Sequence, residues 1–212
     1  MLQIQNYKKT YSAAPVLSIP ELELADGIYW LQGPNGSGKT TLLKSIAGLI
    51  PFEGSIAVKG LSLRKQRMEY TRQVSFAEAE PVYPFFLTGR ELISFYLKTK
   101  GGNTNQAAGL ANALGIAPFL ANPVSSYSSG MLKKLSLLLS LMGDPSLILL
   151  DEPFITLDVN AVAVLQSLIE TSVQKGISFL ISTHQELALT VPFCTLQIEQ
   201  RTLKCESNVA GA

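Results

Sequence analysis

Residues 27–50 read GIYWLQGPNGSGKTTLLKSIAGLI, and this stretch decides the fold. Its first six residues are a short apolar run between chain breakers, which predicts a buried parallel strand. The segment that starts at Lys39 has the pattern of a helix and is expected to run to Ile50. Between them, residues 33–40 (GPNGSGKT) match the pattern G-x-x-x-x-G-K-[ST] in the strand–loop–helix context that it requires.

The glycine-rich segment predicts a phosphate-binding loop. Gly33, Gly36 and Gly38 let the backbone curl so that its N–H groups converge on phosphate oxygens, and the helix N-terminus adds a favourable dipole. Lys39 is expected to reach the β and γ phosphates, and Thr40 to offer its hydroxyl to Mg²⁺. The alternative is a glycine turn with a stray lysine, which the flanking strand and helix disfavour.

Two more apolar runs predict parallel strands, at Ser146–Leu150 and Ser178–Ser182. Helix-like sequence follows each of them, at Val159–Gln174 and Gln185–Leu189. Alternation of strands and helices predicts an α/β fold with a mostly parallel sheet.

Two carboxylates follow the second of these strands, in LILLDEP at residues 147–153. The carboxyl ends of parallel strands face the ligand crevice, so both side chains are expected there. Asp151 is predicted to hold Mg²⁺, and Glu152 to act as the general base on the attacking water. The alternative interpretation is a surface acidic turn.

His184 is the only histidine of the chain and follows the third strand, in FLISTHQ. A lone histidine is often structural. Here it is predicted at the same sheet edge as Asp151, where a neutral imidazole can contact both a γ-phosphate oxygen and the attacking water.

The rest of the chain predicts two additions to this core. The first 25 residues suggest an antiparallel β layer, and residues 195–205 a hairpin. Thr88 and Glu91 have capping-box spacing at the start of a helix, and a second helix is expected after Gly101, over residues 106–114. We expect a single domain over residues 1–212, with a core lobe (1–87 and 131–212) and a small helical insertion (about 88–130).

Composition excludes several classes of protein. Charged residues make up 16% of the chain and the net charge is +1, which argues against disorder and against nucleic-acid binding. Two cysteines are too few for a disulfide scaffold or a zinc site. No apolar run has the length of a membrane span, and residues 1–11 do not resemble a signal peptide. The expectation is a soluble, cytoplasmic chain.

Five motifs occur in order along the chain: GPNGSGKT, YSSGM, LILLDEP, ITLD and STHQ. In this the sequence resembles the ATP-binding subunits of ABC transporters along nearly its whole length, with the exporter-type members as the better match. DEPFITLDVNAVA and STHQEL also resemble, more weakly, the haem-exporter ATPases of cytochrome c maturation. YSSGMLKKLS instead looks more like the drug- or polysaccharide-type exporter ATPases.

The resemblance implies a site for ATP and Mg²⁺ shared between two copies of the chain. Catalytic roles fall on Glu152, His184 and Lys39, and the metal ligands are Thr40 and Asp151. Tyr11 stands where the family has the aromatic ring that stacks on adenine. The alternative is that Tyr11 or Tyr7 is only a packing residue. The remaining nucleotide-binding positions are Gly33, Pro34, Asn35, Gly36, Ser37, Gly38, Lys39, Thr40, Thr41, Ser128, Ser129, Gly130 and Asp158.

Ser128–Gly130 and Asp158 are implied to act across a head-to-tail dimer, on the nucleotide that a second copy or a paralogous subunit holds. The sequence departs from the family pattern at two places. Ser129 stands where a glycine is usual, and a positive φ there would cost about 1 kcal/mol. Ala79 stands where a glutamine is usual, and either Glu78 or Glu80 replaces it or that contact is lost.

The function implied is ATP hydrolysis that powers a separate transmembrane permease subunit, which would dock along residues 81–87. The alternative is that several of these residues pack inside the helical insertion, in which case Tyr83, Phe85 and Phe86 would all be buried. The subunit would be peripheral at the inner face of the cell membrane, with no nucleic-acid partner and no insertion into the bilayer. Two alternatives are a soluble ABC-type ATPase in assembly or remodelling, and a nucleotide-binding regulator without catalysis.

Overall fold

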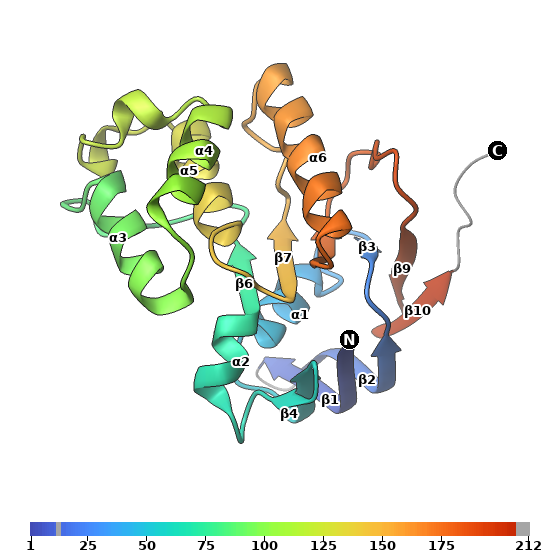
Figure 1. Ribbon diagram of the computed structural model, residues 1–212. Helices are drawn as coiled ribbons and strands as arrows, with labels where there is room; N and C mark the ends of the chain where they lie inside the picture. Colours follow the sequence, from blue (N-terminus) through green and yellow to red (C-terminus); the bar gives the residue numbers. More distant parts are fainter. Residues whose placement is uncertain (12–13, 207–212) are drawn as a thin grey trace.

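The structure is a computed structural model that describes residues 1–11 and 14–206. Two β-sheets organise it, a four-stranded sheet of order β2-β1-β4-β5 and a six-stranded sheet of order β10-β9-β3-β8-β7-β6. Figure 1 shows the smaller sheet below the larger one, with the long helices above and beside it.

The six-stranded sheet carries the predicted strands. Its strands are β3 (Ile28–Gln32), β6 (Val74–Ala77), β7 (Leu147–Asp151), β8 (Ser178–Ser182), β9 (Cys194–Glu199) and β10 (Thr202–Glu206). Every pair in it is parallel except β9 with β10, which form the predicted hairpin. The α/β class and the mostly parallel sheet are therefore confirmed.

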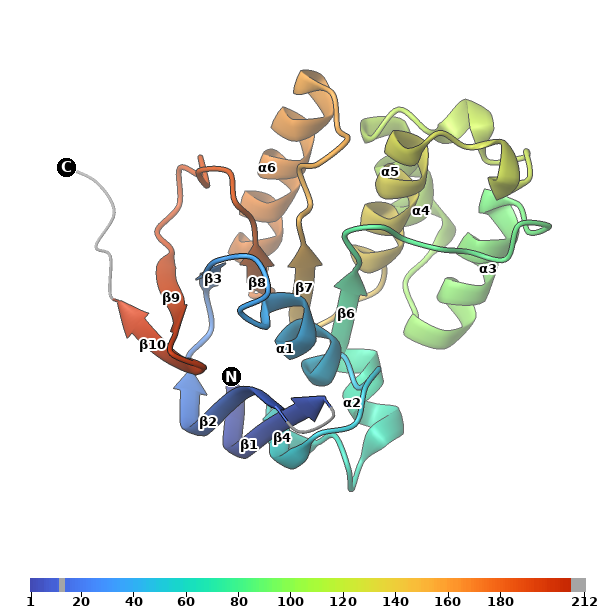
Figure 2. The ribbon, with the colours of Figure 1, turned by 180° about the vertical axis from the view of Figure 1, so that it is seen from behind.

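The N-terminal layer is antiparallel, as expected. It consists of β1 (Leu2–Tyr11), β2 (Ala14–Leu24), β4 (Glu53–Val58) and the short β5 (Leu61–Ser62). Its inner residues pack with helix α1 (Lys39–Ile46) against one face of the parallel sheet. Figure 2 shows α1 between this layer and the strands of the larger sheet.

Strand β7 shows how the two cores divide the apolar residues. Leu147 and Leu149 face the core shared with α1, whereas Ile148 and Leu150 face the core shared with α5 (Ser129–Ser140) and α6 (Val159–Gln174). Successive side chains of a strand point to opposite faces, so a strand covered on both sides is apolar throughout. All residues of β7 and β8 are buried.

The helical insertion contains α3 (Gly89–Lys100), α4 (Thr104–Ala113) and two short 3-10 turns, at Ala117–Phe119 and Val124–Ser126. The capping box at Thr88 and Glu91 is present, with both of its hydrogen bonds. Asn103 caps α4, which therefore begins two residues before the predicted start. The lobe boundaries at residues 88 and 131 stay predictions.

Two helix predictions need correction. Helix α1 ends at Ile46 and not at Ile50, because Gly48 adopts a φ of 74° that stops the helix. The helix predicted at Gln185–Leu189 is wrong, since that segment is irregular. Five residues are too few to sustain a helix without neighbours, and here the Thr183 hydroxyl accepts a hydrogen bond from the Gln185 N–H instead.

Further helices are α2 (Arg67–Gln73), which the sequence pattern did not predict, and α5, which begins two residues before the expected Met131. Within the described parts of the chain, 1–11 and 14–206, no helix is long and apolar enough to cross a lipid bilayer.

Candidate active site

The loop between β3 and α1 has the backbone that the glycine pattern predicted. Gly36 and Gly38 adopt φ values of 77° and 105°, which side chains rarely tolerate. A Cβ on Gly33 would lie 2.7 Å from the Ser37 hydroxyl and 3.2 Å from Ile198, so glycine is required there. No side chain caps the N-terminus of α1, whose N–H groups are left for an anion.

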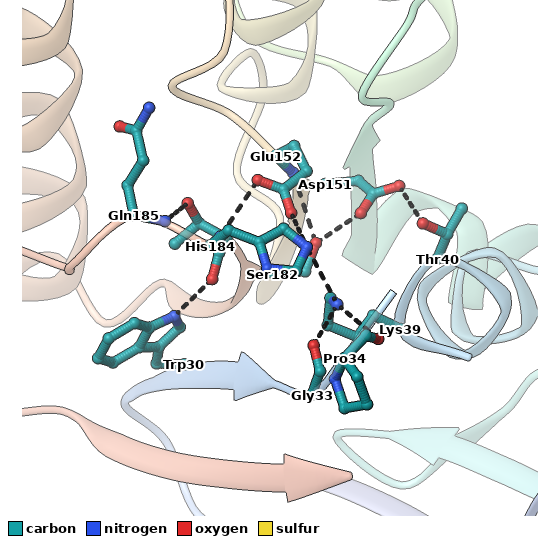
Figure 3. Close-up of polar contacts among 11 residues, drawn as sticks. Trp30, Gly33, Pro34, Lys39, Thr40, Asp151, Glu152, Ser182, His184 and Gln185 are labelled. Carbon is teal, nitrogen blue, oxygen red and sulfur yellow. Dashed lines mark hydrogen bonds and ion pairs between the residues drawn. The ribbon is translucent and has the colours of Figure 1, made fainter. Parts of the chain in front are cut away.

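Lys39 is held within this loop. Its Nζ donates to the carbonyl oxygens of Gly33 at 2.6 Å and Pro34 at 3.3 Å, and lies 3.4 Å from His184 Nε2 (Figure 3). Burial lowers the pKa of Lys39, and the nearby carboxylates of Glu152 and Asp151 partly oppose this shift. The ammonium group is thus held at the loop by two neutral carbonyl oxygens, and no carboxylate of the described residues forms an ion pair with it.

Asp151 ends β7 and is 1% exposed. Its Oδ2 accepts a hydrogen bond from Thr40 Oγ1 at 2.8 Å, and its Oδ1 accepts one from the Ser182 hydroxyl (Figure 3). Ser182 lies directly opposite in β8, so the parallel register brings this contact about. Sequence reasoning missed Ser182, although its place at the end of the neighbouring strand is a signal for such a contact.

The donor set around Asp151 fits Mg²⁺. One carboxylate and one hydroxyl are the oxygen ligands that this ion uses when it also binds phosphate oxygens. Among the residues that the structure describes, no group of three or more His, Cys, Asp or Glu could form an all-protein metal cage. The Ser37 hydroxyl, buried in the loop without a hydrogen-bond partner, is a further polar group suited to a bound nucleotide.

Glu152 follows Asp151 and is held in an unusual backbone conformation, with a φ of 43°. Its N–H donates to the Ser182 carbonyl at 2.9 Å, and its Oε2 accepts from the His184 N–H at 3.3 Å. Its Oε1 lies 3.4 Å from His184 Nε2. A left-handed conformation costs a non-glycine residue about 1–2 kcal/mol, and such strain often occurs at functional sites.

These residues line a single cleft of about 560 Å³. Its walls include Asn35, Gly36, Ser37, Gly38, Lys39, Thr40, Thr41, Asp151, Glu152, His184 and Tyr11. Most of the predicted site is therefore brought together from four separate parts of the chain.

Tyr11, predicted to stack on adenine, and Tyr7, named with it in the packing alternative, lie in different environments. Tyr11 is 51% exposed at the mouth of the cleft, with Lys9 Nζ 4.5 Å from the centre of its ring. Tyr7 is buried and exchanges a hydrogen bond with Ser45 in the core. Tyr7 is thus a packing residue, and Tyr11 is free to meet a ligand.

Ser128, Ser129, Gly130 and Asp158 do not line this cleft. Ser128 caps α5 by accepting a hydrogen bond from Met131 N at 3.2 Å, and Ser129 is the first residue of the helix. The expected strain at Ser129 is wrong, because this residue does not have a positive φ. The substitution of serine for glycine is compatible with the start of a helix.

Asp158 is the N-cap of α6, accepting from Ala161 N at 2.9 Å, and pairs with Lys134 Nζ at 2.6 Å. The Lys134 ammonium lowers the pKa of Asp158. This contact ties the start of α6 to α5. The N-terminus of α6 therefore lies beside the N-terminal part of α5.

Lys133 is a buried residue that sequence reasoning missed. Its Nζ donates to the carbonyl oxygens of Glu78 at 2.8 Å, Ala79 at 3.1 Å and Asp151 at 2.9 Å. It thereby joins α5 to the segment after β6 and to the end of β7. The carboxylate of Glu78 pairs with Lys44 at 3.3 Å, away from this contact. The available signal was a lysine pair in a leucine-rich helix, of which one member must lie toward the core.

A phosphate loop after β3 and an acidic residue at the end of β7, on one parallel sheet, define the class of P-loop nucleotide hydrolases. The family model described as "ABC transporter" matches residues 21–155, most of the chain. The chain therefore belongs to the ABC transporter family, as an ATP-binding subunit with ATPase activity.

The relatives agree with this assignment. The lantibiotic transport ATP-binding protein SrtF of Streptococcus pyogenes is 32% identical, over 87% of this chain and 80% of the relative. The cytochrome c biogenesis ATP-binding export protein CcmA of Legionella pneumophila is 31% identical, over 89% of this chain and 95% of the relative.

Solved structures share the fold. One described as an ATP-binding subunit of an ABC transporter has a TM-score of 0.87 at 24% identity, covering 97% of this chain and 89% of that one. A putative cobalt transport ATP-binding protein has a TM-score of 0.84 at 26% identity, covering 98% and 80%. An ATP-binding cassette solved as a dimer with ADP and phosphate has a TM-score of 0.81 at 18% identity, and each chain is covered fully.

Proposed function

We propose that two copies of this chain close around two molecules of ATP and reopen on hydrolysis, and that this cycle drives a separate exporter subunit in the membrane. The observation that carries the proposal is the presence of two half-sites on one chain. One is the cleft beside Lys39, and the other is the α5 N-terminus at Ser128–Gly130, which lies outside that cleft. A head-to-tail dimer joins one half-site of each kind.

Each side chain has a role that follows from its position. Lys39 and the loop N–H groups neutralise the β and γ phosphates, and the α5 N-terminus of the other copy completes the anion site. Thr40 and Asp151 would hold Mg²⁺, which supplies charge neutralisation on the phosphates.

Glu152 accepts the proton of the attacking water, and His184 orients that water against the γ-phosphate. Their mutual contacts, near 3.4 Å, hold both groups at one end of the cleft. Tyr11 stacks on the adenine ring at the cleft mouth.

The membrane partner is proposed to dock on the segment Pro81–Leu87. Val82, Phe85 and Phe86 are 89%, 73% and 66% exposed, which is unusual for such apolar side chains. A groove of about 350 Å³ begins at the start of this segment, lined by Pro81, Val82 and Tyr83 together with Leu49 and Tyr96 among others. Burial of Tyr83, Phe85 and Phe86 within the protein would have excluded this docking surface. Phe85 and Phe86 are exposed, so it is not excluded.

Several finer points rest on the relatives. SrtF is named a transport protein and CcmA an export protein, which supports export as the direction of transport. We place the subunit at the cytoplasmic face of the membrane, bound to its partner and not inserted in the bilayer. The transported molecule is selected by that partner.

The first experiment measures Mg²⁺-dependent ATP hydrolysis by the purified chain. Glu152→Gln should remove most of the activity while leaving ATP binding intact, since the amide cannot accept a proton. Glu21→Gln, an exposed change in β2, is the matched control. Equal rates for wild type and Glu152→Gln would refute the catalytic role.

A second experiment separates the transporter from a remodelling ATPase. Affinity purification from detergent-solubilised cells should recover an integral membrane protein with the wild-type chain and much less with Phe85→Ser/Phe86→Ser. Met68→Ser removes another exposed apolar side chain, on α2, and should not reduce recovery. Recovery of soluble partners alone would support the remodelling alternative.

A further inference from the structure

Trp30, in the strand that leads into the phosphate loop, contacts both ends of the segment that carries His184. Its indole Nε1 donates to the Thr183 carbonyl at 3.1 Å, and its ring meets Phe193 edge-on with centroids 6.0 Å apart. Residues 183–193 contain no helix or strand, so few backbone hydrogen bonds fix this segment. Figure 3 shows the indole beside the segment, on the side away from Asp151.

The peptide unit between Thr183 and His184 is held from both sides. Trp30 binds its carbonyl oxygen, and its N–H donates to the Glu152 carboxylate at 3.3 Å. A peptide unit is planar and its C=O and N–H point in opposite directions, so fixing one end aims the other. The hydrogen bond from Trp30 therefore orients both the N–H that holds Glu152 and the backbone that carries the His184 ring.

Next to His184, the Thr183 hydroxyl accepts from the Gln185 N–H at 3.1 Å, a contact within the segment that does not tie it to the sheet. Contacts with other elements lie farther along the segment. The Thr190 N–H and hydroxyl both bind the Glu170 carboxylate, at 2.6 and 2.8 Å, and Leu187 is buried. The His184 side chain is 51% exposed and is not confined by packing. Trp30 is thus the side chain best placed to set the geometry at this end of the cleft.

We propose that Trp30 is a positioning residue for ATP hydrolysis, acting through the Thr183–His184 peptide on Glu152 and His184. The inference rests on the proposed roles of those two residues. Trp30 itself does not line the nucleotide cleft, so its effect should fall on the rate of hydrolysis and not on ATP affinity.

The test compares steady-state kinetics of Trp30→Phe with wild type. Phenylalanine keeps a ring against Phe193 but cannot donate to Thr183. We expect kcat to fall about tenfold, with KM for ATP changed by less than about twofold, as for a loss of orientation. Tyr29→Phe is the matched control, because the Tyr29 hydroxyl in the same strand donates to the Ala25 carbonyl at 3.1 Å. An unchanged kcat, or a rise in KM alone, would overturn the proposal.

A double-mutant cycle with His184→Ala separates positioning from a general structural effect. If Trp30 acts through the shared peptide, the combined variant should lose less activity than the product of the two single losses. Independent, multiplicative losses would contradict the proposal. Full activity of His184→Ala would instead refute the proposed role of His184, and a wild-type chain with no ATPase activity would refute the proposed function itself.

Discussion

Lys133 is the least exposed cation of the described residues, at 1%, and its three hydrogen bonds all go to backbone carbonyls. In Lys133→Met those carbonyls lose their donor inside the protein. An unpaired buried polar group costs about 1–3 kcal/mol, so we expect the free energy of unfolding to fall by about 2–3 kcal/mol in urea denaturation. ATP hydrolysis should slow as well, because one of the carbonyls belongs to Asp151.

The neighbouring lysine provides the control for this prediction. Lys134 forms a more exposed ion pair with Asp158, so Lys134→Met should change stability little. If the two variants unfold at the same urea concentration, the three buried hydrogen bonds of Lys133 do not carry the stability assigned to them.

Lys100 gives a prediction on pH. Its Nζ donates to the Val74 carbonyl at 2.6 Å and also contacts the Thr71 carbonyl, and burial lowers its pKa to about 8. The unfolded chain has a lysine pKa near 10.4. Between about pH 8 and 10 the unfolded state therefore binds more protons than the folded state, and the free energy of unfolding rises with pH.

The expected rise is about 2 kcal/mol for Lys100, measured by urea denaturation at pH 8 and pH 10. Burial lowers the pKa of Lys133 to about 8 too, so its contribution has the same sign. In Lys100→Met the free energy of unfolding should rise less between pH 8 and pH 10 than in wild type. Lys98→Met, an exposed change in the same helix, should show the same rise as wild type. Burial also raises the pKa of Tyr7, Tyr70, Tyr83 and Tyr96, and these tyrosines act in the opposite direction as the pH approaches 10, so the comparison with Lys100→Met isolates the part due to Lys100.

At the scale of single residues, the sequence identified the groups of the cleft but not those that hold them. Lys39, Asp151 and Glu152 have spacings that carry chemistry, so each could be named in advance. Ser182 and Trp30 act through contacts between segments far apart in the chain. Such contacts follow from strand register and side-chain packing, which no local pattern encodes.

The N-terminus of α5 gives a prediction at the scale of elements. A Cβ on Gly130 would lie 2.8 Å from the Thr156 carbonyl, a backbone atom that cannot turn aside. Gly130→Ala must therefore move the start of α5 away from the segment before α6. We expect a loss of about 1–3 kcal/mol in the free energy of unfolding, and we expect ATP to induce less dimerisation than in wild type.

Gly109→Ala is the matched control in α4, where an added Cβ meets nothing within 4 Å. Alanine is favoured over glycine inside a helix, so this variant should be as stable as wild type or more stable by up to about 1 kcal/mol. A stability loss of equal size in both variants would show that the contact with Thr156 is not responsible.

Elements with a strong local signal were predicted, and those that depend on distant partners were not. The strands around residues 27–32, 146–150 and 178–182 are apolar because helices or a second sheet cover both faces. The strand Glu53–Val58 was missed because it exists through its pairing with β1. Helix α2 was missed because it is only seven residues long and buries a single side chain, so it has no apolar periodicity. The wrong helix at Gln185–Leu189 had a helix-like composition but no second turn to support it.

For the whole molecule, the low content of charge now has a structural account. The parallel sheet is covered on both faces, which places a large share of the apolar residues in two cores. A further part is exposed on the segment 81–87, and Ile155 and Val159, at 46% and 85% exposed, flank the start of α6. Isolated exposed apolar residues are normal, but grouped ones mark interaction surfaces.

The α6 region and the α5 N-terminus together predict an ATP-dependent dimer. We expect Glu152→Gln to bind ATP without turning it over. Closed dimers should then accumulate, and the mass in solution should rise from 22.9 kDa to about twice that value. Light scattering after size-exclusion chromatography measures this mass with and without ATP.

Two variants in the Glu152→Gln background locate the dimer contact. Lys39→Ala should abolish both ATP binding and dimerisation, because it removes the cation of the phosphate loop. Ser129→Glu should preserve ATP binding in its own cleft yet prevent the dimer. It places a carboxylate at the helix N-terminus that we propose to face the partner's γ-phosphate. If Ser129→Glu still doubles in mass on addition of ATP, the α5 N-terminus is not part of the shared site and the head-to-tail arrangement is wrong.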